Sequence, residues 1–240
     1  MVIIESIVFF YFVYSVAYTA FFSISSFFYI VPSIRVVRPY LRHSHQRFCL
    51  FIPAYKEDAV IVETAHHAVH QSYPRELFDV VVIADQLQPH TLSMLRQLPI
   101  QVAEVEFQQS TKVKSLREAV GRLSSGFDYA IVLDADNIID VDFLQKVNGL
   151  VSTKRYKAIQ VQRRAKNHNN KLAFLDGLSE GINTRIYRQG ASAVGLSSSI
   201  SGSGLIVDFN LLKNYLQTTN AVGGFDRELE LYLLKHGAKV

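Results

Sequence analysis

Apolar and polar residues succeed one another along most of the chain in blocks that predict strands alternating with helices. Short apolar runs predict buried strands at Phe48–Ile52, Phe78–Ala84, Ile100–Val105 and Tyr129–Leu133. Segments with apolar residues at helical spacing lie at Ala59–Gln71, Thr91–Gln97 and Lys112–Leu123, and another begins near Val141. Nearly continuous apolar strands are typical of a parallel sheet covered on both faces. The alternation therefore predicts an α/β fold, a doubly wound and mainly parallel sheet flanked by helices.

Beyond Val151 the pattern becomes less regular. Further strands are predicted at Ala158–Gln162 and Leu205–Val207, and helices at Leu172–Tyr187 and Arg227–His236, the last stopped by Gly237. The first of these helices is amphipathic, and a loop of small residues at 197–204 (SSSISGSG) leads into the second strand.

The N-terminal segment is different, because residues 6–34 carry no charge and are long enough to cross a bilayer as a helix. Basic residues follow it, at Arg35, Arg38, Arg42 and Arg47. The positive-inside rule then places the N-terminus outside and the rest of the chain in the cytoplasm, at a cell (inner) membrane. A cleaved signal peptide is the alternative, although residues 1–5 lack its basic region. We expect an anchor at 1–34, a basic linker at 35–47 and one domain at 48–240.

Composition narrows the class of protein. A chain of 240 residues, 49% hydrophobic, can bury one core with an appendage. The net charge of +4 does not call for nucleic acid, so no nucleic-acid partner is expected. The single cysteine, Cys49, excludes an internal disulfide and fits a reducing compartment. Neither G-x-G-x-x-G after the first strand nor G-K-[ST] occurs, which argues against a dinucleotide oxidoreductase and a P-loop NTPase.

Two carboxylates end the strand at Tyr129–Leu133, in the sequence Asp134-Ala135-Asp136. Ionised acids at the end of a buried strand need a partner, and hard cations such as Mg²⁺ or Mn²⁺ prefer oxygen ligands. The pattern indicates a divalent cation that shares its coordination with phosphate oxygens. Taken alone, the two acids could equally cap the next helix and form a turn.

Other acids follow neighbouring strands. Glu57 comes after the first strand, beside Tyr55, and Asp85 closes the second. In parallel α/β sheets ligands bind in the crevice beyond the carboxyl ends of the strands, which is where these acids and the Asp134–Asp136 pair should meet. Chance placement of capping residues on the same edge is the competing explanation.

His66 and His70 have the i, i+4 spacing of a zinc pair but lack a third ligand, so a structural role is favoured. Arg163 and Arg164 are interpreted as a solvated loop, and Lys112 and Lys114 could be the solvated face of a helix.

The order of six motifs resembles the membrane-associated family 2 glycosyltransferases of the GT-A fold. The motifs are IPAYKED, VVVIAD, KVKSLREA, VLDADN, GSG and FDRELELYLLKHGAKV, and together they span roughly Arg47 to Val240. The resemblance implies a Rossmann-like GT-A domain that moves a sugar, with inversion, from a nucleotide-diphosphate donor, in the first place a UDP-sugar. It also implies Mn²⁺ or Mg²⁺ as cofactor and a lipid-linked or polysaccharide acceptor at the membrane.

Carried over by position, the resemblance assigns roles to single residues. Asp226 matches the catalytic base, and Asp136 and Asp134 match the metal-binding acids. The nucleotide-sugar site would comprise Ala54, Tyr55, Glu57, Asp85, Lys112, Asp134, Gly202, Ser203 and Gly204.

Three positions depart from the family pattern: Lys56 and Arg117 stand where asparagine is frequent, and Phe225 replaces the glutamate beside the base. The motif Gln-x-x-Arg-Trp and the later membrane helices of processive relatives are also absent, so the chain is expected to be C-terminally truncated. These departures keep open a catalytically silent GT-A module that binds a nucleotide or scaffolds a membrane complex. A nucleotidyltransferase is a nearer alternative, but its first loop would need more basic residues than Lys56.

Overall fold

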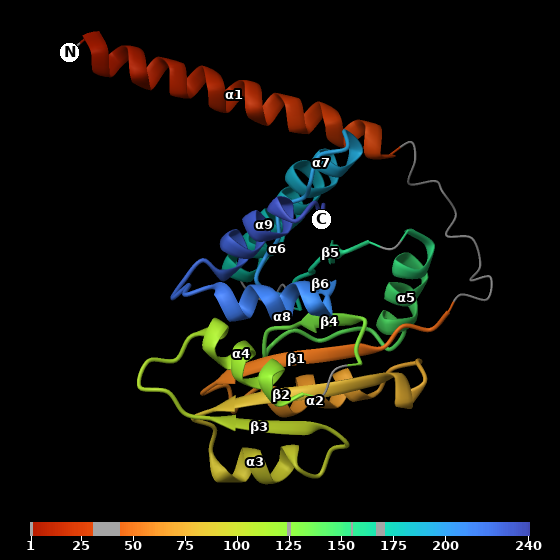
Figure 1. Ribbon diagram of the computed structural model, residues 1–240. Helices are drawn as coiled ribbons and strands as arrows, with labels where there is room; N and C mark the ends of the chain where they lie inside the picture. Colours follow the sequence, from red (N-terminus) through yellow and green to blue (C-terminus); the bar gives the residue numbers. More distant parts are fainter. Residues whose placement is uncertain (1, 31–43, 124–125, 155, 167–170) are drawn as a thin grey trace. The chain divides into compact units, whose positions relative to one another are not determined.

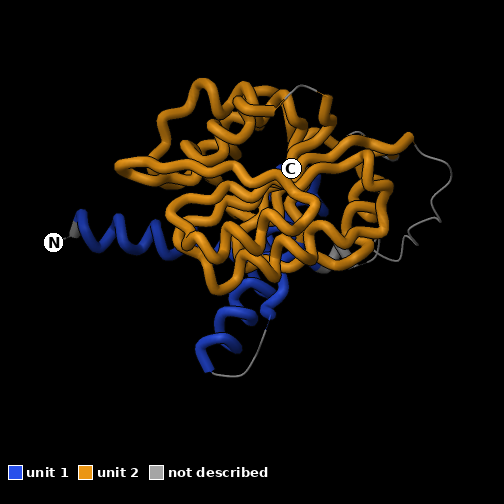
Figure 2. The backbone as a smooth tube through the Cα atoms, turned by 90° about the horizontal axis from the view of Figure 1, so that it is seen from below, with its two compact units in different colours: residues 1–39, 162–199 blue, residues 40–161, 200–240 orange. Residues whose placement is uncertain are grey.

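The computed structural model describes residues 2–30, 44–123, 126–154, 156–166 and 171–240. Contacts divide the chain into two units, one of residues 1–39 and 162–199 and the other of residues 40–161 and 200–240 (Figure 2). The second unit contains the sheet and every predicted site residue. Most of the predicted basic linker, with Arg35, Arg38 and Arg42, lies outside the described residues.

A six-stranded sheet forms the centre of the second unit (Figure 1). Its strands are β1 (Phe48–Tyr55), β2 (Phe78–Asp85), β3 (Gln101–Val105), β4 (Tyr129–Val132), β5 (Ala158–Gln160) and β6 (Leu205–Asp208). The order is β3-β2-β1-β4-β6-β5. The pairs β3-β2, β2-β1 and β1-β4 are parallel, whereas β6 runs antiparallel to both β4 and β5. The predicted mainly parallel α/β sheet is confirmed.

Side chains on the central strands alternate between two cores, as the pleat of a strand requires. On β1, Leu50 and Ile52 face one core, and Cys49 and Phe51 face the other. Both sets are fully buried, which is why the strand reads as one continuous apolar run.

Helices cover both cores. The helices of this unit are α2 (Ile61–Val69), η2 (Arg75–Leu77), α3 (Pro89–Leu95), α4 (Lys112–Arg122), α5 (Phe143–Lys154), α8 (Phe209–Thr218) and α9 (Phe225–Lys235). Residues of α2, α3 and α5 join the first core, and residues of α4, α8 and α9 join the second. Helix α8 is not among the predicted elements. Asp208 caps it by accepting a hydrogen bond from the Leu211 N–H.

The first unit is helical in the part that the structure describes. It comprises α1 (Val2–Ile30), α6 (Lys171–Ile182), the π-helical turn η3 (Asn183–Gln189) and α7 (Gly190–Ala193). The helix predicted at Leu172–Tyr187 is therefore present, and its second part has π geometry. Residues 3–26 of α1 are long and apolar enough to cross a membrane, a test that a signal sequence near the N-terminus also passes.

Candidate functional site

A cavity of about 420 Å³ opens at the carboxyl ends of β1, β2 and β4, beside the start of α4. Figure 1 shows where these strands and α4 lie in the sheet unit. Most of the predicted site residues line it: Ala54, Tyr55, Glu57, Asp85, Lys112, Asp134 and Asp136. Pro53, Ser110, Thr111, Ser115 and Ala135 complete the lining. Because parallel strands end at the same edge of a sheet, acids that are far apart in the sequence meet here.

Asp85, the last residue of β2, has the most unusual environment in the cavity. Its side chain is 1% exposed, and neither carboxylate oxygen has a hydrogen-bond partner among the described residues. A buried carboxylate without a partner is costly, because it has lost water and gained nothing in exchange. A ligand with hydroxyl or N–H donors would supply the missing hydrogen bonds.

Backbone strain is stored beside Asp85. Lys56 and Gln86, which follow β1 and β2, have left-handed backbone conformations with φ of 56° and 55°. The Lys56 N–H donates to the Asp85 carbonyl at 3.0 Å and so ties the two strand ends together. Left-handed non-glycine residues are costly and cluster at functional sites. Asparagine, which is frequent at this position in the family, tolerates the left-handed conformation well. Lys56 therefore adopts it at a higher cost in backbone strain.

Lys112, the first residue of α4, connects three segments of the chain. Its ammonium group donates to Asp134 Oδ1 at 2.5 Å and to the Gly202 carbonyl. The same nitrogen lies 5.9 Å from the centre of the Phe225 ring. Asp134 therefore has an internal cation, unlike Asp85.

The cavity lining does not include Gly202, Ser203 or Gly204. Hydrogen bonds nevertheless connect their loop to the lining residues Lys112 and Asp134. The Asp134 N–H donates to Ser203 Oγ at 2.8 Å. The side chain of Gln160 accepts from the Ser201 N–H at 2.8 Å and donates to the Ser203 carbonyl at 2.9 Å. The small-residue loop thus has a defined position relative to the Asp134–Asp136 pair.

The start of α4 supplies the residues that sequence reasoning missed. Thr111 caps the helix by accepting from the Lys114 N–H at 3.2 Å, and Ser110 and Ser115 lie beside it in the cavity wall. Ser110 Oγ is buried and has no hydrogen-bond partner among the described residues. Free N–H groups and the dipole make a helix N-terminus favourable for anions such as phosphate. The Ser-Thr pair before a helical pattern was the available signal.

Asp226 lies in the first turn of α9, partly exposed, and is not among the lining residues. Its neighbour Phe225 is 7% exposed and packs against the Tyr215 ring at 5.9 Å. Burial raises the pKa of the Tyr215 hydroxyl, and the carboxylates of Glu228 and Asp226 raise it further. Because Phe225 is buried against Tyr215, it is a core residue next to the predicted base Asp226.

The departure at Arg117 is also explained by packing. Its Nε donates to the Leu216 carbonyl at 2.6 Å, and its guanidinium also donates to the Thr219 carbonyl. Arg117 therefore joins α4 to the end of α8 and lies outside the lining of the cavity.

The acids on the cavity wall can serve as ligands of a divalent cation. The described residues contain no group of three His, Cys, Asp or Glu side chains that could hold a metal ion. Asp134 and Asp136 offer hard oxygen ligands on the cavity wall. This set fits Mg²⁺ or Mn²⁺ that takes its remaining ligands from a diphosphate and water, as these ions commonly do.

Solved structures provide the first comparison. A mannosyltransferase from Pyrobaculum calidifontis, in complex with GDP-Man and Mn²⁺, is 18% identical with a TM-score of 0.60, covering 93% of this chain and 64% of its own. S. aureus TarS is 17% identical with a TM-score of 0.55, covering 79% of this chain and 54% of that one. The structure of TarS in complex with UDP-GlcNAc is 17% identical with a TM-score of 0.50, and the match covers 70% of this chain and 47% of that one. At these identities the likenesses show the fold alone, and the predicted GT-A fold is confirmed.

The chain thus spans roughly half to two thirds of the length of these proteins. No curated protein matches it. The profile of the family described as "Glycosyltransferase like family 2" matches residues 45–240, which is most of the sequence and the whole predicted domain. The chain belongs to this glycosyltransferase-like family 2.

Proposed function

We propose that the chain is a membrane-anchored, inverting glycosyltransferase that takes a sugar from a nucleotide-diphosphate donor, in the first place a UDP-sugar. The observation that carries the proposal is the convergence of Asp85, Asp134, Asp136 and the start of α4 on one cavity. Family membership and relatives solved with GDP-Man, UDP-GlcNAc and UDP support it. The acceptor is a lipid-linked sugar or polysaccharide, because α1 would hold the site at the inner membrane, facing the cytoplasm.

Each part of the cavity matches one part of such a donor. The unpaired carboxylate of Asp85 accepts hydrogen bonds from the base or ribose, next to Tyr55 and Ala54. The α4 N-terminus and Lys112 face the diphosphate, where their positive charge is favourable. Asp134 and Asp136 would hold the cation with their carboxylate oxygens.

The reaction is a single displacement. The acceptor oxygen forms a bond to the anomeric carbon while the bond from that carbon to the diphosphate oxygen breaks. Asp226 takes the proton of the acceptor hydroxyl as general base. Lys112 stabilises the negative charge on the departing diphosphate. When bound, Mn²⁺ or Mg²⁺ supplies further positive charge to that leaving group.

A catalytically silent nucleotide-binding module is the second candidate. It is favoured by Phe225, which removes a carboxylate beside the base, and by the position of Asp226 outside the lining residues. A silent module would bind the donor and never turn it over.

The test is a transfer assay on the complete protein in nanodiscs, with Mn²⁺, a panel of nucleotide sugars and membrane lipid extract as acceptor source. The transferase proposal expects sugar incorporation and release of free nucleoside diphosphate, both abolished in Asp136→Ala. Saturable donor binding with no release from any nucleotide sugar would contradict it and favour the silent module.

A further inference from the structure

Helix α6 carries an exposed apolar face. Phe174, Leu175, Leu178 and Ile182 recur at the spacing of one helix side, and their exposed fractions are 57%, 56%, 50% and 45%. A contiguous patch of large exposed apolar side chains of this kind marks an interaction site rather than ordinary surface. We call these four residues the α6 apolar face.

The other side of α6 carries polar residues that are partly engaged within its own unit, and Leu172, one turn before Asp176, is exposed on it as well. Asp176 is exposed, and Glu180 accepts from Arg188 at 2.6 Å and lies 3.8 Å from Arg163. The helix is therefore amphipathic, with the ion pairs on one side and the apolar face on the other.

The C-terminal end of the same helical stretch is packed on α1. A Cβ atom on Gly190 would lie 2.7 Å from the Phe22 carbonyl, so only glycine permits this close approach of two backbones. The Tyr187 ring stacks on Tyr18 at 6.0 Å between centroids. Ser25 is 3% exposed at the same contact region of α1. The contact involves the end of α1 that precedes the basic linker.

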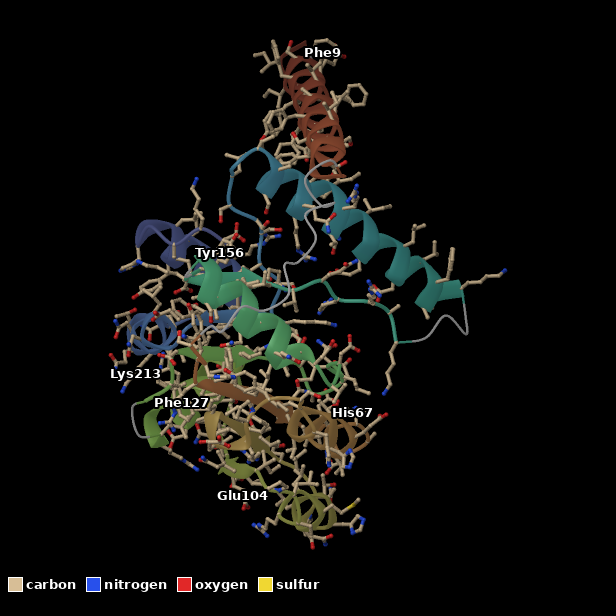
Figure 3. The ribbon with its side chains drawn as sticks, turned by 90° about the vertical axis from the view of Figure 1, so that its right-hand side faces the viewer. Phe9, His67, Glu104, Phe127, Tyr156 and Lys213 are labelled. Carbon is tan, nitrogen blue, oxygen red and sulfur yellow. The ribbon has the colours of Figure 1, made fainter. Side chains whose placement is uncertain are left out.

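The direction of the two helices suits a bilayer. Figure 3 looks nearly along α1, from which the labelled Phe9 projects, while the helix from α6 to α7 runs across the view. In Figure 1 that helix meets α1 near its C-terminal end. If α1 spans the membrane along its normal, a helix that crosses it steeply at one end runs close to the membrane surface.

Charge supports a lipid partner over a protein one. Arg164 and Lys166 precede α6, Lys171 opens it, and all three are exposed. Basic residues beside a membrane helix are attracted to anionic headgroups, by about 1 kcal/mol each near the surface.

We propose that α6 lies in the surface of the bilayer, with Phe174, Leu175, Leu178 and Ile182 in the acyl boundary and the basic residues at anionic headgroups. The proposal rests on the anchoring of the chain by α1. It makes the 162–199 segment a second membrane contact of the unit that contains α1.

Site-directed spin labelling tests the proposal on the complete chain in phosphatidylcholine nanodiscs, with and without phosphatidylglycerol. Labels are placed at Leu178→Cys, at Asp176→Cys as the matched control on the polar side, and at Phe12→Cys as reference within α1. Cys49 is fully buried and burial raises the pKa of its thiol, so it does not compete for the label.

The proposal expects the Leu178 label to collide with oxygen several-fold more than with a water-soluble nickel complex, as the Phe12 label does. The Asp176 label should show the reverse ratio, and phosphatidylglycerol should increase the difference. A Leu178 label as accessible to nickel as the Asp176 label would overturn the proposal. So would a label shielded from both reagents, which indicates a protein cover, or dipolar broadening, which indicates a second copy. A water-exposed Phe12 label would remove the anchor itself, whereas the donor-binding cavity would be unaffected.

Discussion

The carboxylates at the two ends of the cavity, Asp85 and Asp134, have opposite environments. At the β2 end, Asp85 is 1% exposed and neither of its carboxylate oxygens has a hydrogen-bond partner among the described residues. At the β4 end, Asp134 is partly exposed and held by Lys112 at 2.5 Å. At the β4 end the protein itself offsets the charge of Asp134 with Lys112. At the β2 end the carboxylate of Asp85 is left for hydrogen-bond donors that a ligand would bring.

This difference separates two contributions to donor binding. The β2 end is destabilising without a ligand, because a buried unpaired carboxylate costs free energy. At the β4 end, the charge of Asp134 is already offset by its ion pair with Lys112.

Replacing Asp226, which belongs to neither end, should have the largest effect. Asp226→Asn keeps the shape of the side chain but cannot accept the acceptor proton, so turnover should fall by about 10²- to 10⁴-fold. Donor affinity should stay unchanged in calorimetry. Glu228→Gln, in the same turn of α9, is the matched control and should retain turnover. Equal turnover in both variants would remove Asp226 as the base.

Asp85→Asn tests the β2 end. Donor affinity should fall by about 10- to 100-fold, because a hydrogen bond to a charged group contributes about 1.5–3 kcal/mol. The ligand-free protein should become more stable, by about 1 kcal/mol, since the buried charge is gone. Calorimetric titration with UDP and urea denaturation measure the two changes. A variant that loses stability and keeps its affinity would show that Asp85 has a purely structural role.

Lys112→Met tests the β4 end. Loss of the ammonium group should weaken UDP binding by about tenfold, in line with the loss of one charge-assisted contact. Mn²⁺ binding in the absence of UDP should become tighter, because Asp134 is released. Lys114→Met is the control, since Lys114 Nζ donates to the Gln109 carbonyl at 2.7 Å and Lys114 is not among the residues that line the cavity. Weaker Mn²⁺ binding in Lys112→Met would refute the idea that Lys112 competes for Asp134.

A smaller effect of pH on stability is expected from Tyr215, which lies in α8 and packs against Phe225 of α9. The pKa of Tyr215 is raised by burial, so above a pH of about 10 the folded protein retains a proton that the unfolded chain has lost. The free energy of unfolding should therefore fall as the pH rises through this range. Tyr215→Phe should flatten this part of the decline in urea denaturation measured over a pH series. An unchanged slope would mean that other groups cause it.

The sequence predicted the parts of the fold that depend on local pattern. The apolar runs at β1, β2 and β4 placed four acids, Glu57, Asp85, Asp134 and Asp136, at the edge of the sheet where the cavity lies. Helix α8 was missed, although Asp208 as its cap and apolar residues at helical spacing were visible in the sequence.

The pairing of charges within the site could not be predicted. Lys112 is 22 residues from Asp134 and 90 from Gly202, so their contact depends on tertiary packing rather than on spacing. The isolation of Asp85 likewise follows from what surrounds it, and the roles assigned to single residues by resemblance stay predictions. Arg117 is a further example, because its link to α8 is a product of the packed fold.

The most direct test of one shared site for nucleotide and cation is calorimetric titration of UDP into the chain, with Mn²⁺ and with a chelator. The comparison includes Asp136→Ala and the control Asp140→Ala, an exposed acid four residues along the chain and outside the cavity lining. We predict that UDP binds the unsubstituted chain and Asp140→Ala with Mn²⁺, and that chelator or Asp136→Ala weakens binding at least tenfold. UDP binding that is unaffected by both the chelator and Asp136→Ala would contradict the account.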